Sequence, residues 1–227
     1  MDWWHALLLG LVQGLTEFLP VSSSGHLMIF KELLGVDAEG FLDFTVTVHA
    51  ATVLSTIIVF WSAIKAILKG FFKFRYNDET DYLLKICVSM IPVFVVGMFF
   101  KDKVEALFGH SLTTVAVCLL ITASLLVISE YFSRSRSGSV DIANTHRNGI
   151  SYLQAFLVGI GQAVAVAPGL SRSGTTIATG LLSGVRRDVI AQFSFLMVLI
   201  PIIGEQFLDV VGSFGEASAA PGVGVPA

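Results

Sequence analysis

The sequence predicts an all-α fold: a polytopic membrane helix bundle with an inverted-topology repeat and two re-entrant helical hairpins. Three observations carry this prediction. Apolar residues make up 54% of the 227 residues and charged residues only 14%, and the mean hydropathy is +0.79. Several apolar segments are long enough to cross about 30 Å of hydrocarbon as helices. A serine-glycine pattern follows an apolar segment twice, at 22–25 and at 171–174.

Four apolar segments are expected to cross the membrane. They are Phe44 to Trp61, Leu83 to Phe100, Leu112 to Phe132 and Val189 to Val211. Basic residues gather in the stretches from Ser62 to Lys85 and from Ser133 to Gly149, which are expected to be loops. By the positive-inside rule, both loops face the cytoplasm.

Two further apolar stretches, Trp3 to Val21 and Tyr152 to Leu170, contain glycines and a proline and then continue into second short helices. Irregular backbone at membrane depth is tolerated only where protein or water satisfies its polar groups. We therefore expect two re-entrant hairpins, and the loop positions place their entrances on opposite faces of the membrane.

The two hairpins belong to an internal repeat. A shift of 149 positions aligns Gly10 with Gly159, Gln13 with Gln162, Ser22 with Ser171, Ser24 with Ser173, Gly25 with Gly174 and Phe44 with Phe193. In inverted-topology repeats, discontinuous helices from the two copies meet and build one site. We expect one membrane domain over 1–212, with repeat 1 at about 1–105 and repeat 2 at about 106–212, followed by a small-residue tail at 213–227.

Each serine-glycine elbow lies where a helix begins. Serine side chains there cap free backbone N–H groups and the helix dipole adds positive potential, so two facing helix N-termini favour a multiply charged anion. The candidate anion-binding residues are Ser22, Ser24, Gly25, Ser171, Ser173 and Gly174.

The positions that differ between the two copies carry the reactive groups. Ser23 aligns with Arg172, and the first copy alone holds Glu17 and His26. The Arg172 guanidinium fits phosphate oxygens, with a salt bridge to Glu17 as the alternative. Glu17, among apolar neighbours, must be protonated, paired with Arg172 or bound to a cation.

Two histidines could contribute to the site. His26 lies in the first turn of its helix, where the dipole favours the neutral imidazole that a nucleophile or general base needs; the alternative is a core histidine bonded to a carbonyl. His49 could line the same cavity or pack in the core. A nucleic-acid partner is excluded, because the net charge is −3 and the 14 Lys and Arg residues form no dense cationic face.

At these residues the sequence resembles the undecaprenyl pyrophosphate phosphatases of the bacitracin-resistance type. The matching motifs run from Gly14 to His26 and from Pro168 to Thr176, followed by Gln192 to Leu196. The resemblance implies an enzyme of the bacterial inner membrane that hydrolyses undecaprenyl pyrophosphate to the monophosphate. This reaction would recycle the lipid carrier for peptidoglycan synthesis, at a site open to the outer side.

The resemblance also implies roles for individual residues. The functional set would be Glu17, Ser23, His26 and Arg172, with phosphate contacts from Ser171, Ser173 and Thr176, and with Mg²⁺ or Ca²⁺ as the divalent cation. Both Ser23 and His26 are compatible with the nucleophile. From the residues we choose His26, with Ser23 orienting phosphate, because imidazole needs no further base.

The chain departs from the family pattern in two places. Gln13 stands where some members carry Glu, which leaves Glu17 as the metal ligand and Gln13 as a substrate contact. The second departure is at the C-terminus. Family members usually continue through further membrane helices, whereas this sequence ends in the small-residue tail at 213–227, which suggests a truncated copy. The expected partners are an isoprenoid pyrophosphate lipid and membrane lipids, and a homodimer is left open. The alternative function is a polyprenyl-phosphate transporter or flippase, since inverted repeats serve alternating access.

Overall fold

The computed structural model describes residues 1–100, 111–136, 147–167 and 169–199, except for the side chains of 38–40, 42 and 43. The helices are α1 Trp3–Glu17, α2 Ser23–Leu34, α3 Ala38–Val59, α4 Trp61–Phe71, α5 Asp78–Phe99, α7 Leu112–Arg136, the 3-10 turn η2 Arg147–Gly149, α8 Tyr152–Val164 and α9 Arg172–Leu182. A further helix covers 187–199. No strand occurs within these ranges, so the all-α prediction is confirmed.

Two of the predicted spans are single helices. α5 and α7 are long enough to cross a membrane, with mean hydropathies of 2.1 and 2.4 over their most apolar windows. Residues Phe44–Val59 of α3 and Trp61–Phe71 of α4 qualify as one broken span bent by 71°. The protein is therefore embedded in a membrane. The predicted span from Val189 to Val211 lies partly outside the described residues, and the tail at 213–227 lies wholly outside them.

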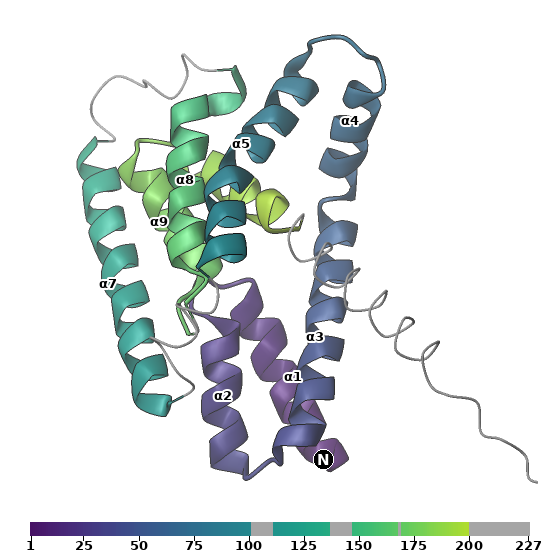
Figure 1. Ribbon diagram of the computed structural model, residues 1–227, viewed down its shortest axis with the longest axis vertical. Helices are drawn as coiled ribbons and strands as arrows, with labels where there is room; N and C mark the ends of the chain where they lie inside the picture. Colours follow the sequence, from purple (N-terminus) through teal and green to yellow (C-terminus); the bar gives the residue numbers. More distant parts are fainter. Residues whose placement is uncertain (101–110, 137–146, 168, 200–227) are drawn as a thin grey trace, which may run out of the picture.

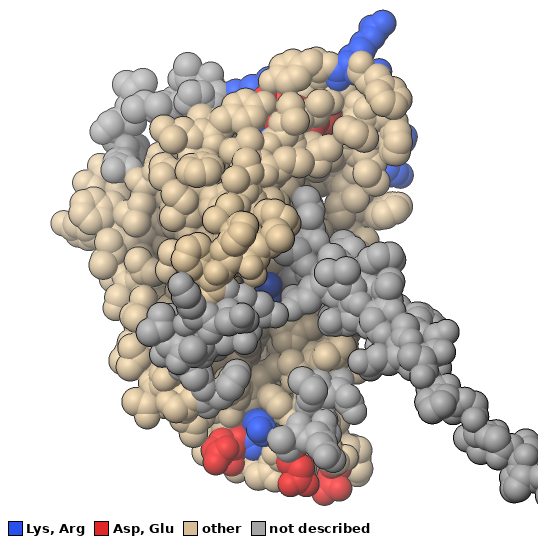
Figure 2. Space-filling model, in the orientation of Figure 1, with Lys and Arg blue, Asp and Glu red and all other residues tan. Residues whose placement is uncertain are grey.

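Charged side chains gather at the two ends of the long axis on the face shown in Figure 2, and the visible surface between them is mostly uncharged, with a small blue area of Lys or Arg. Many large apolar side chains are exposed, such as Phe94 and Met98 on α5, which are 64% and 62% exposed. Apolar side chains exposed in this number suit a lipid environment, because hydrocarbon replaces the water they would otherwise meet.

The basic stretch from Ser62 to Lys85, expected as a loop, is largely helical. α4 occupies its first part and α5 begins at Asp78, so only 72–77 connect the two helices. The prediction was wrong because Lys65 and Lys69 were taken as loop residues. They are four positions apart, so they fall on one face of an amphipathic helix.

The helix pair α1–α2 occupies the lower half of the bundle and α8–α9 the upper half (Figure 1). Each pair is a helix, a break and a second helix, at the two places where hairpins were predicted. The re-entrant path and the inverted orientation of the two copies stay predictions.

The second hairpin is held closely against α5. A Cβ added at Gly159 of α8 would lie 2.2 Å from the Ser89 carbonyl oxygen of α5, so only glycine permits this approach of the two backbones. Buried side chains of α8, α9 and the 187–199 helix, among them Val158, Leu181 and Phe193, form the main hydrophobic core beside it.

A buried polar cluster joins the start of α5 to the segment before α8. Lys85 Nζ lies 2.5 Å from Asp81 Oδ2 and donates to the Arg147 carbonyl at 2.6 Å. The hydroxyls of Tyr76 and Tyr152 donate to Asp81 Oδ1 at 2.6 and 2.8 Å. The Asp81 and Lys85 side chains are each only 3% exposed, so the cluster satisfies two charges that would be costly to bury alone.

Candidate active site

The first elbow connects α1 to α2. α1 ends at Glu17 and α2 begins at Ser23, with Ser22 as the N-cap residue. The Ser22 hydroxyl accepts a hydrogen bond from the Gly25 backbone N–H at 3.3 Å, as the cap prediction requires. Ser22 has φ +68°, a left-handed conformation that residues with a Cβ seldom adopt. Such strain is typical of sites where the chain must turn sharply to present its backbone.

The second elbow repeats the capping contacts 149 positions later. Ser171 caps α9, and its hydroxyl accepts from the Gly174 N–H at 3.0 Å. In each elbow the cap hydroxyl also lies 3.4 Å from the hydroxyl of the serine two positions onward: Ser22 from Ser24, and Ser171 from Ser173. The two helices therefore begin with the same capping contacts, although the Ser171 backbone is extended, with φ −71°, where that of Ser22 is left-handed.

The two elbows touch. A Cβ added at Gly174 would lie 2.8 Å from the Pro20 carbonyl oxygen of the first elbow. It would also lie 2.8 Å from Thr122 Cγ2 of α7, whose hydroxyl accepts a hydrogen bond from the Ser171 N–H at 3.2 Å. The prediction that both elbows form one cavity is confirmed by this contact and by the pocket that lies beside it.

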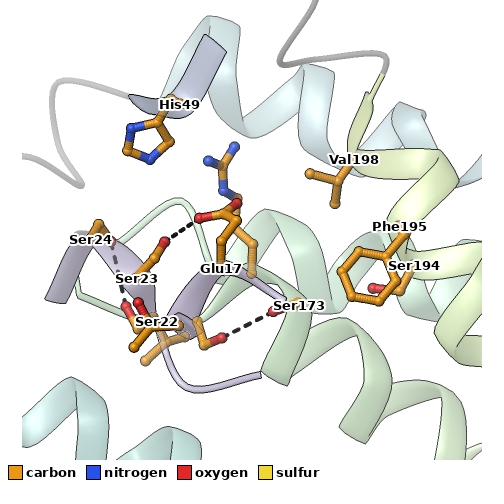
Figure 3. A pocket seen from close by; sticks show the side chains of 13 residues that line it. Glu17, Ser22, Ser23, Ser24, His49, Ser173, Ser194, Phe195 and Val198 are labelled. Atoms are coloured by element: carbon orange, nitrogen blue, oxygen red, sulfur yellow. Dashed lines mark hydrogen bonds between the residues drawn. The ribbon is translucent and has the colours of Figure 1, made fainter. Parts of the chain in front are cut away.

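The pocket at this junction has about 520 Å³ of empty space, its open mouth included. Figure 3 shows side chains converging on it from the two elbows, from α3 and from the 187–199 helix. Its lining comprises Thr16, Glu17, Ser22, Ser23, Ser24, His49, Leu170, Ser171, Arg172, Ser173, Ser194, Phe195 and Val198. Seven of the predicted site residues, those at 17, 22–24 and 171–173, thus lie around one space.

Glu17 and Arg172 carry the opposite charges of this pocket. Glu17 Oε2 accepts from Gln13 Nε2 at 2.9 Å and from the Ser23 hydroxyl. The two hydrogen bonds fix the orientation of the carboxylate at the first elbow. Within the part of the chain that the structure describes, the Arg172 side chain forms no ion pair and no hydrogen bond, so the alternative of a Glu17–Arg172 salt bridge is not realised. No described residue competes with an anion for the guanidinium.

The remaining predicted residues surround the pocket without lining it, as far as the described residues show. His26 Nδ1 lies 2.8 Å from the Ser22 carbonyl oxygen and donates to it, so the ring braces the first elbow. Thr176 is fully buried, donates to the Arg172 carbonyl at 2.9 Å and is hydrogen-bonded to Ser194. Gln13 is 1% exposed, and its side-chain amide donates a hydrogen bond to the Glu17 carboxylate.

Sequence reasoning did not select Thr16, Leu170, Ser194, Phe195 and Val198, although they line the pocket. The repeat held a signal for one of them. The 149-position shift places Val198 opposite His49, and both line the pocket. Thus α3 and the 187–199 helix each present this equivalent position to the same space.

The fold and the pocket together define a class. The chain is a helical membrane protein whose two serine-capped helix N-termini, one guanidinium and one carboxylate converge on a partly open pocket suited to a multiply charged anion.

Comparison with known proteins places the chain within this class. The sequence matches the family described as bacitracin resistance protein BacA over residues 6–225, and the chain belongs to that family. Similar proteins named undecaprenyl-diphosphatase come from Bacteroides fragilis, at 53% identity over 96% of this chain and 79% of the relative, and from Christiangramia forsetii, at 45% identity over 97% and 79%. A protein of that name from Halothermothrix orenii is 38% identical over 92% of this chain and 75% of the relative.

Proposed function

We propose that this protein hydrolyses undecaprenyl diphosphate to undecaprenyl phosphate and inorganic phosphate. Its relatives carry the name of that activity at up to 53% identity over most of the chain. The observation that carries the proposal is the guanidinium of Arg172 at the N-terminus of α9, which has no partner among the described residues and faces the carboxylate and hydroxyl of the first elbow across one pocket. The transporter alternative is not favoured, because a carrier needs the anion clamp but not the Glu17–Ser23 pair beside it.

The pocket residues divide the work of hydrolysis. Arg172 and the backbone N–H groups of the two helix N-termini bind the phosphate oxygens and stabilise charge that develops on them. Water supplies the oxygen that joins the terminal phosphorus, and the bond from that phosphorus to the bridging oxygen breaks. The lipid monophosphate leaves with the bridging oxygen. If a covalent phosphoenzyme forms first, water attacks it in a second step.

The nucleophile of such a covalent path is His26 or Ser23. We propose His26 from its chemistry, since neutral imidazole attacks phosphorus without a base. Ser23 has geometric support of its own, because its hydroxyl lines the pocket and donates to the carboxylate that could accept its proton. His26, bonded to the Ser22 carbonyl through Nδ1, keeps only Nε2 for attack.

The described residues of the pocket offer only a few oxygen ligands for a divalent cation. Among the described residues no cluster of three His, Cys, Asp or Glu exists, so the protein alone offers no closed cage. Mg²⁺ is commonly held by one or two carboxylates together with substrate phosphates and water. Glu17 would hold Mg²⁺ or Ca²⁺ in that manner, together with the buried Gln13 side-chain oxygen, which has no hydrogen-bond partner among the described residues. The ion would offset phosphate charge.

The proposed location is the bacterial inner membrane with the site open to the outer side. The support is charge distribution: the end of the bundle formed by α4 and the start of α5 carries Lys65, Lys69, Lys73 and Arg75, which the positive-inside rule assigns to the cytoplasm. The substrate tail would lie among the lipid-facing helices while its diphosphate reaches the elbows.

Phosphate release by purified protein from undecaprenyl diphosphate in detergent tests the function. Arg172→Lys should lower kcat/KM about 10- to 100-fold, because a point charge cannot replace a planar fork that makes charge-assisted hydrogen bonds. Arg134→Lys is the matched control, since the Arg134 side chain is 81% exposed and distant from the pocket lining. An Arg172→Lys enzyme with wild-type kinetics would remove the guanidinium from the mechanism, and wild-type protein that releases no phosphate would refute the function.

A further inference from the structure

A histidine outside both elbows reaches the pocket. His49 lies on α3, about one-half of the way along that helix, and is one of the residues that line the pocket with Glu17 and Arg172. Figure 3 shows its ring extending from α3 on the side of the pocket where Ser23 and Ser24 lie. The ring is half-buried, so it is accessible from the pocket while it belongs to the interior of the bundle.

The structure fixes which nitrogen of His49 is available. Nδ1 lies 2.8 Å from the Thr45 carbonyl oxygen, and a carbonyl oxygen only accepts hydrogen bonds. Nδ1 therefore carries a hydrogen and donates it. Nε2, on the other side of the ring, has no hydrogen-bond partner among the described residues. An imidazole whose second nitrogen is tied to backbone is oriented in the way that a ligand-binding histidine requires.

The internal repeat pairs position 49 with position 198. Val198, 149 positions later, lines the same pocket from the 187–199 helix. The two helices that follow the elbows thus present equivalent positions to one space, and only the first copy places a polar ring there. Ser23 and Arg172 show the same division, in which equivalent positions carry different chemistry and together build an asymmetric site.

A diphosphate in the pocket can accept a further hydrogen bond besides those from Arg172 and the helix N-termini. Glu17 already accepts from two donors, and among the described lining residues only Arg172 provides a guanidinium. A diphosphate carries at least two negative charges and several oxygens that accept hydrogen bonds. Nε2 can donate to an ionised phosphate oxygen as imidazolium, or accept from a protonated one as neutral imidazole. In either protonation state it can hydrogen-bond the headgroup.

We propose that His49 is a substrate-binding residue whose Nε2 hydrogen-bonds a phosphate oxygen, so that α3 closes the headgroup pocket from the side opposite the second elbow. This inference rests on the proposed function and adds a contact to the elbow residues. His49 binds the headgroup without forming a bond to phosphorus. Its loss should therefore appear chiefly in KM, and glutamine should replace it, because its amide donates at similar reach.

The experiment compares His49→Ala, His49→Gln and a control, His5→Ala, which removes a histidine from the start of α1, away from the pocket lining. KM and kcat are measured with undecaprenyl diphosphate, and the inhibition constant is measured with inorganic diphosphate. A lost hydrogen bond to a charged group predicts a rise of about 10- to 100-fold in both KM and the inhibition constant for His49→Ala. His49→Gln should remain within about threefold of the wild type, and kcat should change less than KM in both variants.

The outcomes distinguish the binding role of His49 from the proposed diphosphatase activity. If the wild type releases phosphate and His49→Ala keeps its KM and its inhibition constant, the inference is wrong and the function stands. If His49→Gln loses kcat at unchanged KM, His49 acts in the chemical step or in folding, and the binding role is refuted. If no phosphate is released at all, binding of inorganic diphosphate to the wild type and to His49→Ala, measured by calorimetry, still decides whether His49 binds the anion. Unfolding temperatures in detergent identify any variant that has lost its fold.

Discussion

Replacement of Gly174 by alanine tests whether contact between the two elbows organises the pocket. Gly174 lies in the first turn of α9 and its N–H is bonded to the Ser171 cap. An added Cβ would lie 2.8 Å from the Pro20 carbonyl oxygen and 2.8 Å from Thr122 Cγ2, whereas ordinary contacts begin at 3.4 Å. The elbows must therefore separate by about 0.6 Å, since the nearest atom on the first elbow is backbone and cannot rotate away.

The magnitude follows from that displacement. Overpacking of this kind costs about 1–3 kcal/mol of stability. A shift of about 1 Å between binding groups can lower an enzymatic rate by about 100-fold. Because Arg172 and Ser23 lie on opposite elbows, a separation of about 0.6 Å should reduce kcat/KM about 10- to 100-fold while the protein remains folded.

The assay is phosphate release from undecaprenyl diphosphate, with the unfolding temperature in detergent measured alongside. Gly10→Ala is the matched control, because a Cβ at Gly10 of α1 meets nothing within 4 Å and alanine stabilises a helix by up to about 1 kcal/mol. The control should keep wild-type kinetics. Gly174→Ala with wild-type kcat/KM and unfolding temperature would show that the close approach of the elbows is not required.

Two further predictions concern the buried cluster and the nucleophile. Lys85→Met should destabilise the protein by about 3–5 kcal/mol, measured as a lower unfolding temperature, because the 3% exposed Asp81 carboxylate loses its charge partner; an unchanged temperature would mean that the tyrosine hydroxyls suffice. If a covalent intermediate forms, rapid quenching should trap a phosphoenzyme. A phosphohistidine at His26 is labile in acid, whereas an acid-stable phosphoserine at Ser23 would overturn our choice.

Most of the secondary structure was predictable because helix formation in hydrocarbon depends on local sequence. Runs such as Leu83 to Phe100 and Leu112 to Phe132 must be helical to satisfy their own backbone, whatever they pack against. The same reasoning failed at α4, where lysines at helical spacing were taken as a loop. Charge alone does not distinguish a solvated loop from an amphipathic helix at the membrane surface.

The site was partly predictable for a related reason. The repeat and the capping serines mark helix starts in the sequence, so residues 22–24 and 171–173 could be identified from the sequence alone. The sequence ranked His26 above His49, because His26 lies in the first turn of the helix that follows the first elbow. Both are bonded through Nδ1 to a carbonyl four residues earlier, yet only His49 lines the pocket within the described residues.

The sequence by itself determined that this is a membrane-embedded helical protein with two capped elbows, because hydropathy and helix capping act over a few neighbouring residues, and the repeat is visible as matching residues in the sequence. Only the tertiary structure decided that the elbows meet at Gly174, that Arg172 has no partner among the described residues and that α3 contributes His49. Those facts depend on how close helices from distant parts of the chain can approach. That distance is set by packing between side chains, which no local pattern records.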